Sequence, residues 1–339
     1  MSLKSEKILI IRFSSIGDIV LTSAVVRCIK KQLPKSEIYF LTKKQFENIV
    51  AFNPNIYKVI CFNNSLPNTI SELKEIGFDY IIDLHNNLRS RLVTAVFPFT
   101  KVFRFNKLNA EKWLLTNFKI DRLPQKHIVD RYFDAIKPLD IINDEVGLDF
   151  FIAEKDTFNI NTLSENFKTG YIVFSIGGQH ETKKMPIHKW QQLAVANQYP
   201  TIILGGKEEF EVGEQISQSS SYILNLCGKT SLAESASVMQ QCKAVITHDT
   251  GLMHIAAAFK KPIVSIWGNT VPVFGMYPYY GKYIIPNIQA EVKNLDCRPC
   301  SKLGHKKCPE GHFKCMETQD IAAVILFLKE NLLPEFPVI

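Results

Sequence analysis

Short apolar segments alternate with helical ones along the chain, and this alternation restricts the fold more than any other feature. In the first part, apolar runs of strand length lie at residues 7–13, 37–42, 58–62 and 80–85. Helical patterns lie at residues 19–33 and 70–77, and the second ends at Gly77, a residue type common at helix C-termini. Buried strands separated by helices predict a parallel sheet that helices cover on both faces.

The same pattern starts again after residues 143–170, a weakly patterned stretch that we interpret as a connection. Further strand-length runs lie at residues 171–178, 201–206, 222–228, 244–249 and 262–267. The sequence therefore predicts an α/β protein with two doubly wound Rossmann-like domains facing each other across a cleft. We place the domains at residues 1–160 and 161–339, and the last helix is a candidate to pack back on the first domain.

The composition agrees with a globular protein of this size. The chain has 339 residues, is 46% hydrophobic and has a mean hydropathy near zero. No apolar run approaches the roughly 18 residues of a membrane-spanning helix, and the first residues do not resemble a secretory signal. Eight cysteines in so long a chain do not indicate a secreted disulfide scaffold. We therefore expect a reducing, cytoplasmic environment.

Positive charge is concentrated in residues 86–126. Nine basic residues lie there: Arg89, Arg91, Lys101, Arg104, Lys107, Lys112, Lys119, Arg122 and Lys126. Only Glu111 and Asp121 oppose them, so this segment alone carries +7, the formal net charge of the chain. A solvated helical face is the simplest explanation. The interleaved aromatic residues instead favour an anionic lipid or glycolipid partner. Nucleic acid is disfavoured, because no zinc finger, RNA-recognition signature or basic zipper is present.

The segment 245–268, VITHDTGLMHIAAAFKKPIVSIWG, contains a strand, a small-residue helix and a second strand. The helix opens with Asp249 and Thr250, which are natural N-cap residues, and with Gly251, which allows close approach of a ligand to the backbone. Free N–H groups of Thr250, Gly251 and Leu252 would favour an anionic guest such as a pyrophosphate. An ordinary capped, buried helix is the alternative.

A matching turn follows the first strand in RFSSIGDIVLTS. Gly17 makes the turn and Asp18 begins the next helix. The glycine fingerprint of dinucleotide-binding domains is absent from this turn. We interpret Asp18 as a general base, with a plain N-cap as the alternative. The helix dipole would keep the carboxylate ionised, so that it could accept a proton.

Several of these segments together resemble the bacterial lipopolysaccharide heptosyltransferases, glycosyltransferase family 9. They are ILIIRFSSIGDIVLTS, KKMPIHKW, LGGKEE, LCGKTSLAE and HDTGLMHIAAAFKKPIVSIWGNTVPVFGMYPY. The resemblance runs from the first strand to about Tyr279, and with the cysteine segment to Met316. It implies a GT-B fold, an ADP-heptose donor, inversion at the anomeric carbon and no essential catalytic metal. It also implies a lipid-anchored inner-core acceptor, with peripheral contact at the cytoplasmic face of the inner membrane.

The resemblance assigns roles to individual residues of the second domain, the nucleotide-sugar side. Lys183 corresponds to a lysine that offsets the charge of the departing diphosphate, although Lys184 is its rival and Met185 replaces the usual tryptophan. Glu208 corresponds to a carboxylate that binds the donor ribose, with Glu209 as its rival. The remaining donor-site candidates are Gly178, Asp249, Thr250, Gly251, Leu252 and His254.

The first domain would bind the acceptor. Asp18 corresponds to the family's proposed base, and we expect Ser15, Gly17, Arg89, Arg91 and Arg104 to contact the acceptor. Two other interpretations stay open for the whole chain. One is a non-catalytic nucleotide- or glycolipid-binding protein of the same fold. The other is a two-domain dehydrogenase, which the missing glycine fingerprint disfavours.

The segment CRPCSKLGHKKCPEGHFKC contains four of the eight cysteines. Cys297, Cys300, Cys308 and Cys315 could together hold a structural zinc ion. The second pair is spaced too widely for a standard zinc ribbon. Reduced thiols in a loop are the alternative, and a disulfide is disfavoured in cytoplasm.

Overall fold

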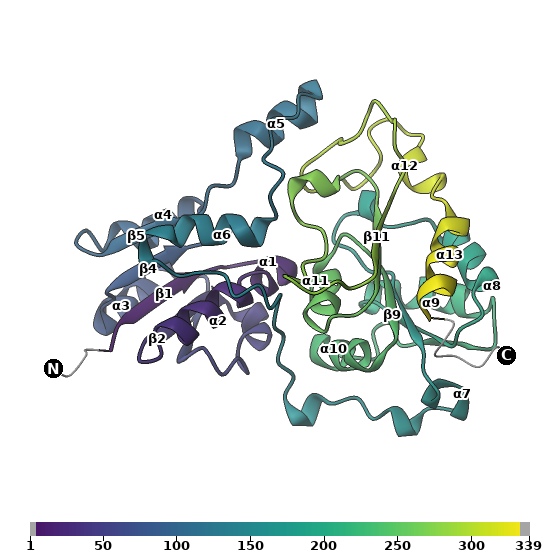
Figure 1. Cartoon of the computed structure of the whole chain (residues 1–339), viewed down its shortest axis with the longest axis horizontal. Coiled ribbons are helices and arrows are strands. Elements are labelled where there is room, and N and C mark those ends of the chain that lie inside the picture. The colour runs from purple at the N-terminus through teal and green to yellow at the C-terminus, as the bar shows by residue number, and fades with distance from the viewer. Residues whose placement is uncertain (1–4, 333–339) are drawn as a thin grey trace. The chain divides into compact units, whose positions relative to one another are not determined.

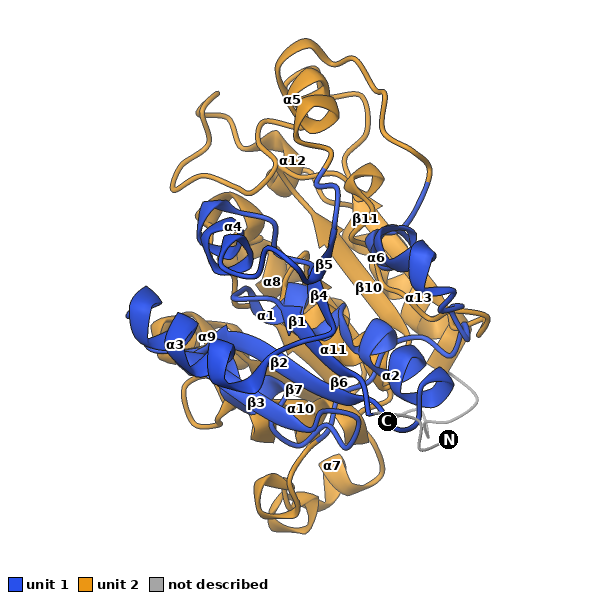
Figure 2. Cartoon of the chain, turned by 90° about the vertical axis from the view of Figure 1, so that its left-hand side faces the viewer, with its two compact units in different colours: residues 1–107, 126–151 blue, residues 108–125, 152–339 orange. Residues whose placement is uncertain are grey.

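The computed structural model describes residues 5–332, which form two compact units. Of the described residues, the first unit comprises 5–107 and 126–151, and the second comprises 108–125 and 152–332 (Figure 2). The chain passes from the first unit to the second for the last time between residues 151 and 152, whereas we placed the domain boundary after residue 160. Residues 108–125, which we placed in the first domain, belong to the second unit because Leu115 and Leu123 pack on Phe274 there.

Five parallel strands form the sheet of the first unit, in the order β3-β2-β1-β4-β5. Their bounds are β1 Lys7–Ile11, β2 Glu37–Lys43, β3 Lys58–Phe62, β4 Tyr80–Asp83 and β5 Lys101–Arg104. In the centre, Ile10 of β1 lies beside Phe40 of β2 and Ile82 of β4. The strand order reverses between β1 and β4. Doubly wound sheets bind ligands at the carboxyl ends of strands at such a reversal.

The helices of this unit are α1 Ile16–Val20, α2 Ser23–Gln32, α3 Leu66–Ile76, α4 Leu88–Ala95 and α6 Ile128–Ile136. The single helix expected at residues 19–33 is thus two helices. The hydroxyl of Thr22, between them, donates to the carbonyl of Ile19 at 2.7 Å. Such a local bond competes with helical hydrogen bonding and often bends a helix, and this one lies where α1 ends and α2 begins.

An irregular segment, residues 141–151, runs along α2 and ends the first unit. The Arg27 guanidinium holds it by pairing with Asp144 at 2.9 Å and with Asp149, and by donating to the Gly147 carbonyl at 2.7 Å. The Ser23 hydroxyl accepts from the backbone N–H of Asp149 at 2.9 Å. These ion pairs and hydrogen bonds hold residues 141–151 against α2, although the segment has no regular secondary structure.

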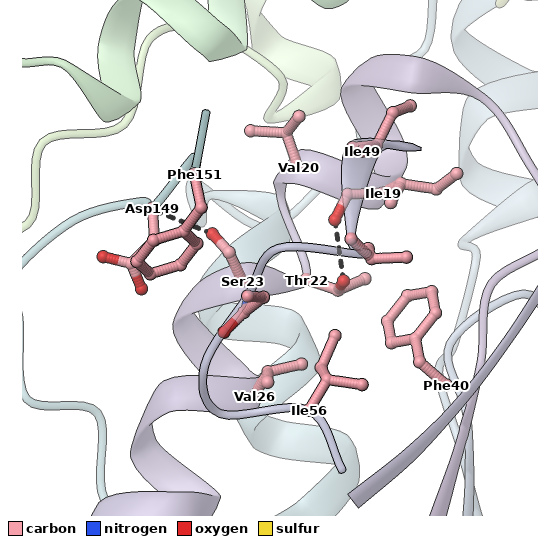
Figure 3. Close-up of a pocket in the computed structure, with 12 residues that line it drawn as sticks. Ile19, Val20, Thr22, Ser23, Val26, Phe40, Ile49, Ile56, Asp149 and Phe151 are labelled. Carbon is pink, nitrogen blue, oxygen red and sulfur yellow. Dashed lines mark hydrogen bonds between the residues drawn. The ribbon is translucent and has the colours of Figure 1, made fainter. Parts of the chain in front are cut away.

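A hollow beneath this segment is lined mainly by apolar side chains of α1, α2 and β2, including Ile19, Val26 and Phe40 (Figure 3). Its hydroxyls are already engaged, Thr22 with the carbonyl of Ile19 and Ser23 with the N–H of Asp149. Ligand sites need convergent polar groups to orient a ligand. We therefore interpret this hollow as a packing gap.

Six parallel strands form the sheet of the second unit, in the order β11-β10-β9-β6-β7-β8. Their bounds are β6 Ile172–Ser175, β7 Thr201–Leu204, β8 Ile223–Asn225, β9 Ala244–His248, β10 Ile263–Trp267 and β11 Asn287–Glu291. The order reverses between β6 and β9, so a ligand site is expected where these two strands end. Both sheets confirm the predicted doubly wound α/β architecture.

The main helices here are α8 Ile187–Ala196, α9 Phe210–Ser217, α10 Leu232–Gln241, α11 Gly251–Ala258 and α13 Ile321–Leu332, with short helices α7 Glu165–Lys168 and α12 Lys314–Glu317. Phe174 and Trp190 meet in the core at a ring separation of 5.2 Å. The last helix, α13, packs within this unit against α8 (Figure 1). Its Val324 and Phe327 are part of the same core.

Residues 108–125, which we call the α5 arm, carry helix α5, Asn109–Phe118. Leu108 and Lys119 flank this helix with positive φ angles of 53° and 59°. The Lys119 ammonium donates to the carbonyl of Pro299 at 2.9 Å. The arm is therefore attached to the second unit by apolar packing and by this polar contact. Within residues 5–332, no helix has the length and apolar character needed to cross a membrane.

Candidate functional site

Asp18 lies at the strand-order reversal of the first unit, as the third residue of α1, and Ser15 is the N-cap of this helix. One carboxylate oxygen accepts from the Ser15 hydroxyl at 2.8 Å and from its backbone N–H at 3.2 Å. The other lies 2.5 Å from a guanidinium nitrogen of Arg12. Gly17, inside α1, is buried beside it. Ser15, Gly17 and Asp18 thus form one compact turn, in which Ser15 and Arg12 fix the orientation of the carboxylate.

Arg12 is a residue that the sequence interpretation missed, because it stands at the end of an apolar strand. Its guanidinium is nearly buried and also donates to the carbonyls of Ser14, at 2.9 Å, and Leu84. Burial disfavours the ionised form of Asp18, but the Arg12 charge and the Ser15 bonds outweigh burial and hold the pKa of Asp18 at about 2. Asp18 is therefore fully ionised at neutral pH.

Two buried polar groups near this pair have no hydrogen-bond partner among residues 5–332. They are the Tyr132 hydroxyl and the His85 Nδ1 atom. Burial, together with the positive charge of Arg12, lowers the pKa of His85 to about 3, so the ring is neutral. Buried polar atoms are almost always paired. Both atoms are themselves buried, so neither is exposed to a ligand in this structure.

The three arginines expected at the acceptor site lie on the elements after β4. Arg89, on α4, is half-buried and stacks over Phe62 at 4.9 Å and Phe13 at 5.7 Å. Arg91 is exposed and donates to Asn86 at 3.0 Å. Arg104 ends β5 and donates to Thr94 at 2.8 Å. Arg89 thus stacks on Phe13, which directly follows Arg12 in the chain, whereas the side chains of Arg91 and Arg104 are exposed.

The N-terminus of α11 lies at the strand-order reversal of the second unit. Thr250 is its N-cap, but no side chain caps the helix, which differs from the role expected for Asp249. In the part of the chain that the structure describes, the N–H groups of Thr250, Gly251 and Leu252 have no acceptor. A Cβ atom on Gly178 would lie 3.7 Å from the Thr250 methyl group, so the loop after β6 borders this helix end. The turn has the form of an anion cradle.

Lys183 and Asp249 meet beside this cradle. The Lys183 ammonium lies 2.5 Å from the Asp249 carboxylate and 3.1 Å from the Asp249 backbone carbonyl. Thr270, in the loop after β10, donates to the same carboxylate oxygen at 2.9 Å. His254, in the second turn of α11, is buried. The Lys183 ammonium is therefore held beside the N-terminus of α11 by Asp249, and its role toward a ligand stays a prediction.

The rival residues Lys184 and Glu209 bind each other. The Lys184 ammonium lies 2.9 Å from Glu209 and 2.8 Å from Glu181. Glu209 is buried and also accepts from the N–H of Gly206 at 2.9 Å. Glu208 is exposed, and no described residue binds its carboxylate. Lys184 and Glu209 thus bind each other, whereas the Glu208 carboxylate is exposed, and the role of Glu208 toward a ligand stays a prediction.

His248 is a second residue that the sequence interpretation missed. This last residue of β9 is fully buried. Its Nε2 atom accepts from the N–H of Met185 at 2.9 Å, and its Nδ1 atom lies 3.2 Å from the carbonyl of Gly177. Burial lowers its pKa to about 4, so the ring is neutral, with Nδ1–H as donor. His248 therefore ties the loop after β6 to the Lys183 turn.

The cysteine segment, residues 297–315, supports the same turn through its backbone. The Thr182 N–H donates to the carbonyl of His305 at 3.2 Å, and the His305 N–H donates to the Thr182 hydroxyl at 2.8 Å. Burial and the adjacent Cys297 thiol raise the pKa of Cys300 to about 12. Within residues 5–332, no three His, Cys, Asp or Glu side chains are arranged as a metal site. The structure thus gives the zinc candidates Cys297, Cys300, Cys308 and Cys315 no metal geometry.

Comparison with protein families gives a match over most of the chain. A family model described as "Glycosyltransferase family 9 (heptosyltransferase)" matches residues 68–311. Lipooligosaccharide heptosyltransferase 2 of Haemophilus influenzae is 25% identical over 295 residues, which cover 79% of this chain and 84% of the relative. Lipopolysaccharide heptosyltransferase 2 of Escherichia coli is 24% identical over 301 residues, with coverages of 79% and 84%.

Solved structures show the same fold. A glycosyl transferase family 9 structure from Veillonella parvula has a TM-score of 0.76 at 22% identity, covering 98% of this chain and 99% of that one. The Escherichia coli heptosyltransferase WaaC with ADP has a TM-score of 0.67 at 20% identity, covering 96% and 99%. These similarities confirm the GT-B fold with its two Rossmann-like domains.

Proposed function

Because the chain belongs to glycosyltransferase family 9, the heptosyltransferases, we propose that it transfers a heptose or a similar sugar from an ADP-sugar to the inner core of a lipopolysaccharide-type glycolipid. It is an enzyme of the glycosyltransferase class. The observation that carries the proposal is the α11 N-terminus, where free N–H groups lie beside the Lys183 ammonium. Such a site suits a diphosphate leaving group.

On the donor side, the diphosphate would accept hydrogen bonds from the N–H groups of Thr250, Gly251 and Leu252. Lys183, whose ammonium now pairs with Asp249, would offset the charge that develops as ADP leaves. Glu208 would accept a hydrogen bond from the ribose. Gly178 would border the phosphates, and Asp249 and His254 would support the cradle. A lysine and a helix N-terminus supply positive charge, so we propose that catalysis requires no metal ion.

On the acceptor side, Asp18 would take the proton of the attacking hydroxyl. The acceptor oxygen forms a bond to the anomeric carbon while the bond from that carbon to the donor phosphate breaks, so the product configuration is inverted. Ser15 and Gly17 would border the acceptor hydroxyl. Arg91, Arg104 and Arg89 would meet anionic groups of the glycolipid, as guanidinium groups pair well with phosphates and carboxylates.

We propose that the enzyme works in the cytoplasm, at the inner face of the membrane that carries its acceptor. Two features support this location. Family relatives are named for lipopolysaccharide or lipooligosaccharide, and the basic segment suits an anionic glycolipid.

The donor assignment is tested by ligand-dependent stability. At 100 times its dissociation constant, ADP is expected to stabilise the protein by about 2.7 kcal/mol. Gly251→Val should abolish this gain, because the side chain would block approach to the helix N-terminus. Stabilisation by UDP or GDP but not by ADP would refute the donor assignment.

The base assignment is tested by Asp18→Asn, which keeps the side-chain shape but removes the proton acceptor. We expect kcat to fall by roughly 10²–10⁴-fold with little change in ADP affinity. Near-normal turnover would exclude Asp18 as the base. Charge reversal at Arg91 and Arg104 should raise the KM for acceptor more than the KM for donor.

A further inference from the structure

The α5 arm exposes a group of large apolar side chains. Trp113, Phe118 and Ile120 are 55%, 58% and 46% exposed, whereas Trp190 and Trp267 are each 1% exposed. Isolated apolar residues on a surface are ordinary. Three within eight positions, including a tryptophan and a phenylalanine whose rings touch, are an unusual concentration that suggests a binding partner.

The arm has two different sides. Leu115 and Leu123 are buried against Phe274 and hold the arm on the second unit. The rings of Trp113 and Phe118 contact each other edge to face at 5.1 Å and stay exposed. The exposed rings therefore belong to a helix that is already anchored, and they are not needed for its attachment.

Positive charge borders this apolar surface. Lys119 and Arg122 are exposed on the arm, where Asp121 is the exposed acid. The Lys302 ammonium lies 3.4 Å from the Asn109 side-chain oxygen, so part of the cysteine segment extends the same surface. Leu303, next to Lys302, is 60% exposed. The arm thus carries exposed rings with cations beside them, one of which, Lys302, comes from a segment distant in sequence.

We propose that this surface, which we call the arm surface, docks the enzyme on an anionic lipid bilayer. Aromatic rings with cationic neighbours are typical of segments that lie in the membrane interface. Helix α5 spans ten residues, which is too short to cross a bilayer, so it would lie in the membrane plane. The inference extends the proposed function, because a lipid-anchored acceptor is met at a membrane.

The expected effects follow from the two kinds of contact. A cation near an anionic membrane contributes about 1 kcal/mol, which is about five-fold in the partition coefficient. Arg122→Gln with Lys302→Gln should therefore weaken vesicle binding by about 25-fold. Trp113→Ser with Phe118→Ser should weaken vesicle binding by at least about ten-fold, because this variant lacks the two large rings that would transfer from water into the membrane interface.

The test is co-sedimentation of the full chain with phosphatidylcholine vesicles that contain or lack phosphatidylglycerol, with no donor present. We expect binding only to the anionic vesicles. A control variant, Val195→Ser with Ile284→Ser, removes two side chains that are 72% and 100% exposed elsewhere in the second unit. It should bind like the wild type. Unchanged thermal unfolding of the arm variants would show that they fold.

Three results would overturn the proposal: no vesicle binding, equal binding to both vesicle types, or binding that the arm variants leave intact. Lipid-free self-association that Trp113→Ser abolishes would assign the surface to a second copy and would also overturn it. Failure of the proposed function is distinguishable, because it would leave vesicle binding intact in a protein that turns over no ADP-sugar.

Discussion

Arg12 should control the pH range in which Asp18 can act as a base. The pKa of Asp18 is about 2, against an ordinary value of 3.8. The difference corresponds to about 2.5 kcal/mol in favour of the ionised form. Arg12→Met removes the main favourable charge and leaves the effect of burial, which raises the pKa. The two Ser15 bonds remain in this variant, so the pKa of Asp18 should rise above its wild-type value of about 2.

The assay is kcat/KM for the acceptor as a function of pH, since its acid limb reports the base in the free enzyme. In the wild type this limb should lie below the pH range in which the protein is assayed. In Arg12→Met it should move to a higher pH than in the wild type. Arg12→Lys keeps the charge and should move the limb far less. If the acid limb of Arg12→Met lies at the same pH as in the wild type, the ion pair with Arg12 is not the cause of the low pKa of Asp18.

Three further predictions concern the second unit. The folded pKa of His248, about 4, lies below its ordinary value of 6.5. Stability should therefore fall as the pH drops from 6.5 towards 4, by about 3 kcal/mol in total. Urea unfolding of His248→Gln should show a weaker pH dependence in this window. Thr182→Val should raise the KM for donor several-fold, because the Lys183 turn loses the hydroxyl that accepts from the His305 N–H and keeps only its backbone bond to the cysteine segment. Glu208→Ala should weaken ADP binding at nearly constant Tm, whereas Glu209→Ala should lower Tm by removing the buried partner of Lys184; the opposite pattern would exchange their roles.

Patterns of apolar residues were sufficient to predict the central strands of both sheets. The edge strands β5 and β11 were missed, because Lys101 and Arg104 bound one and polar residues alternate in the other. An edge strand has a less buried environment, so its sequence carries a weaker apolar signal. The break between α1 and α2 lies at the Thr22 hydroxyl bond, which periodicity does not reveal.

The anion cradle was predictable because its chemistry is local: a strand, a turn with glycine and a helix N-terminus follow one another in sequence. Arg12 and His248 act through distant partners. Arg12 reaches the Leu84 carbonyl, and His248 joins Gly177 to Met185. Such bonds depend on strand order, which single residues do not indicate. The pairing of Lys183 with Asp249 and of Lys184 with Glu209 likewise depends on contacts between residues distant in sequence.

The α5 arm has a consequence for how the protein is made. Leu115 leaves the ribosome 159 residues before its partner Phe274. At about 5–20 residues per second, the arm waits roughly 10–30 s for the surface on which it packs. During this time α6 can complete the first unit, since its residues follow directly after the arm. The nascent chain therefore carries a folded first unit with an apolar insertion, which is a natural binding site for a chaperone.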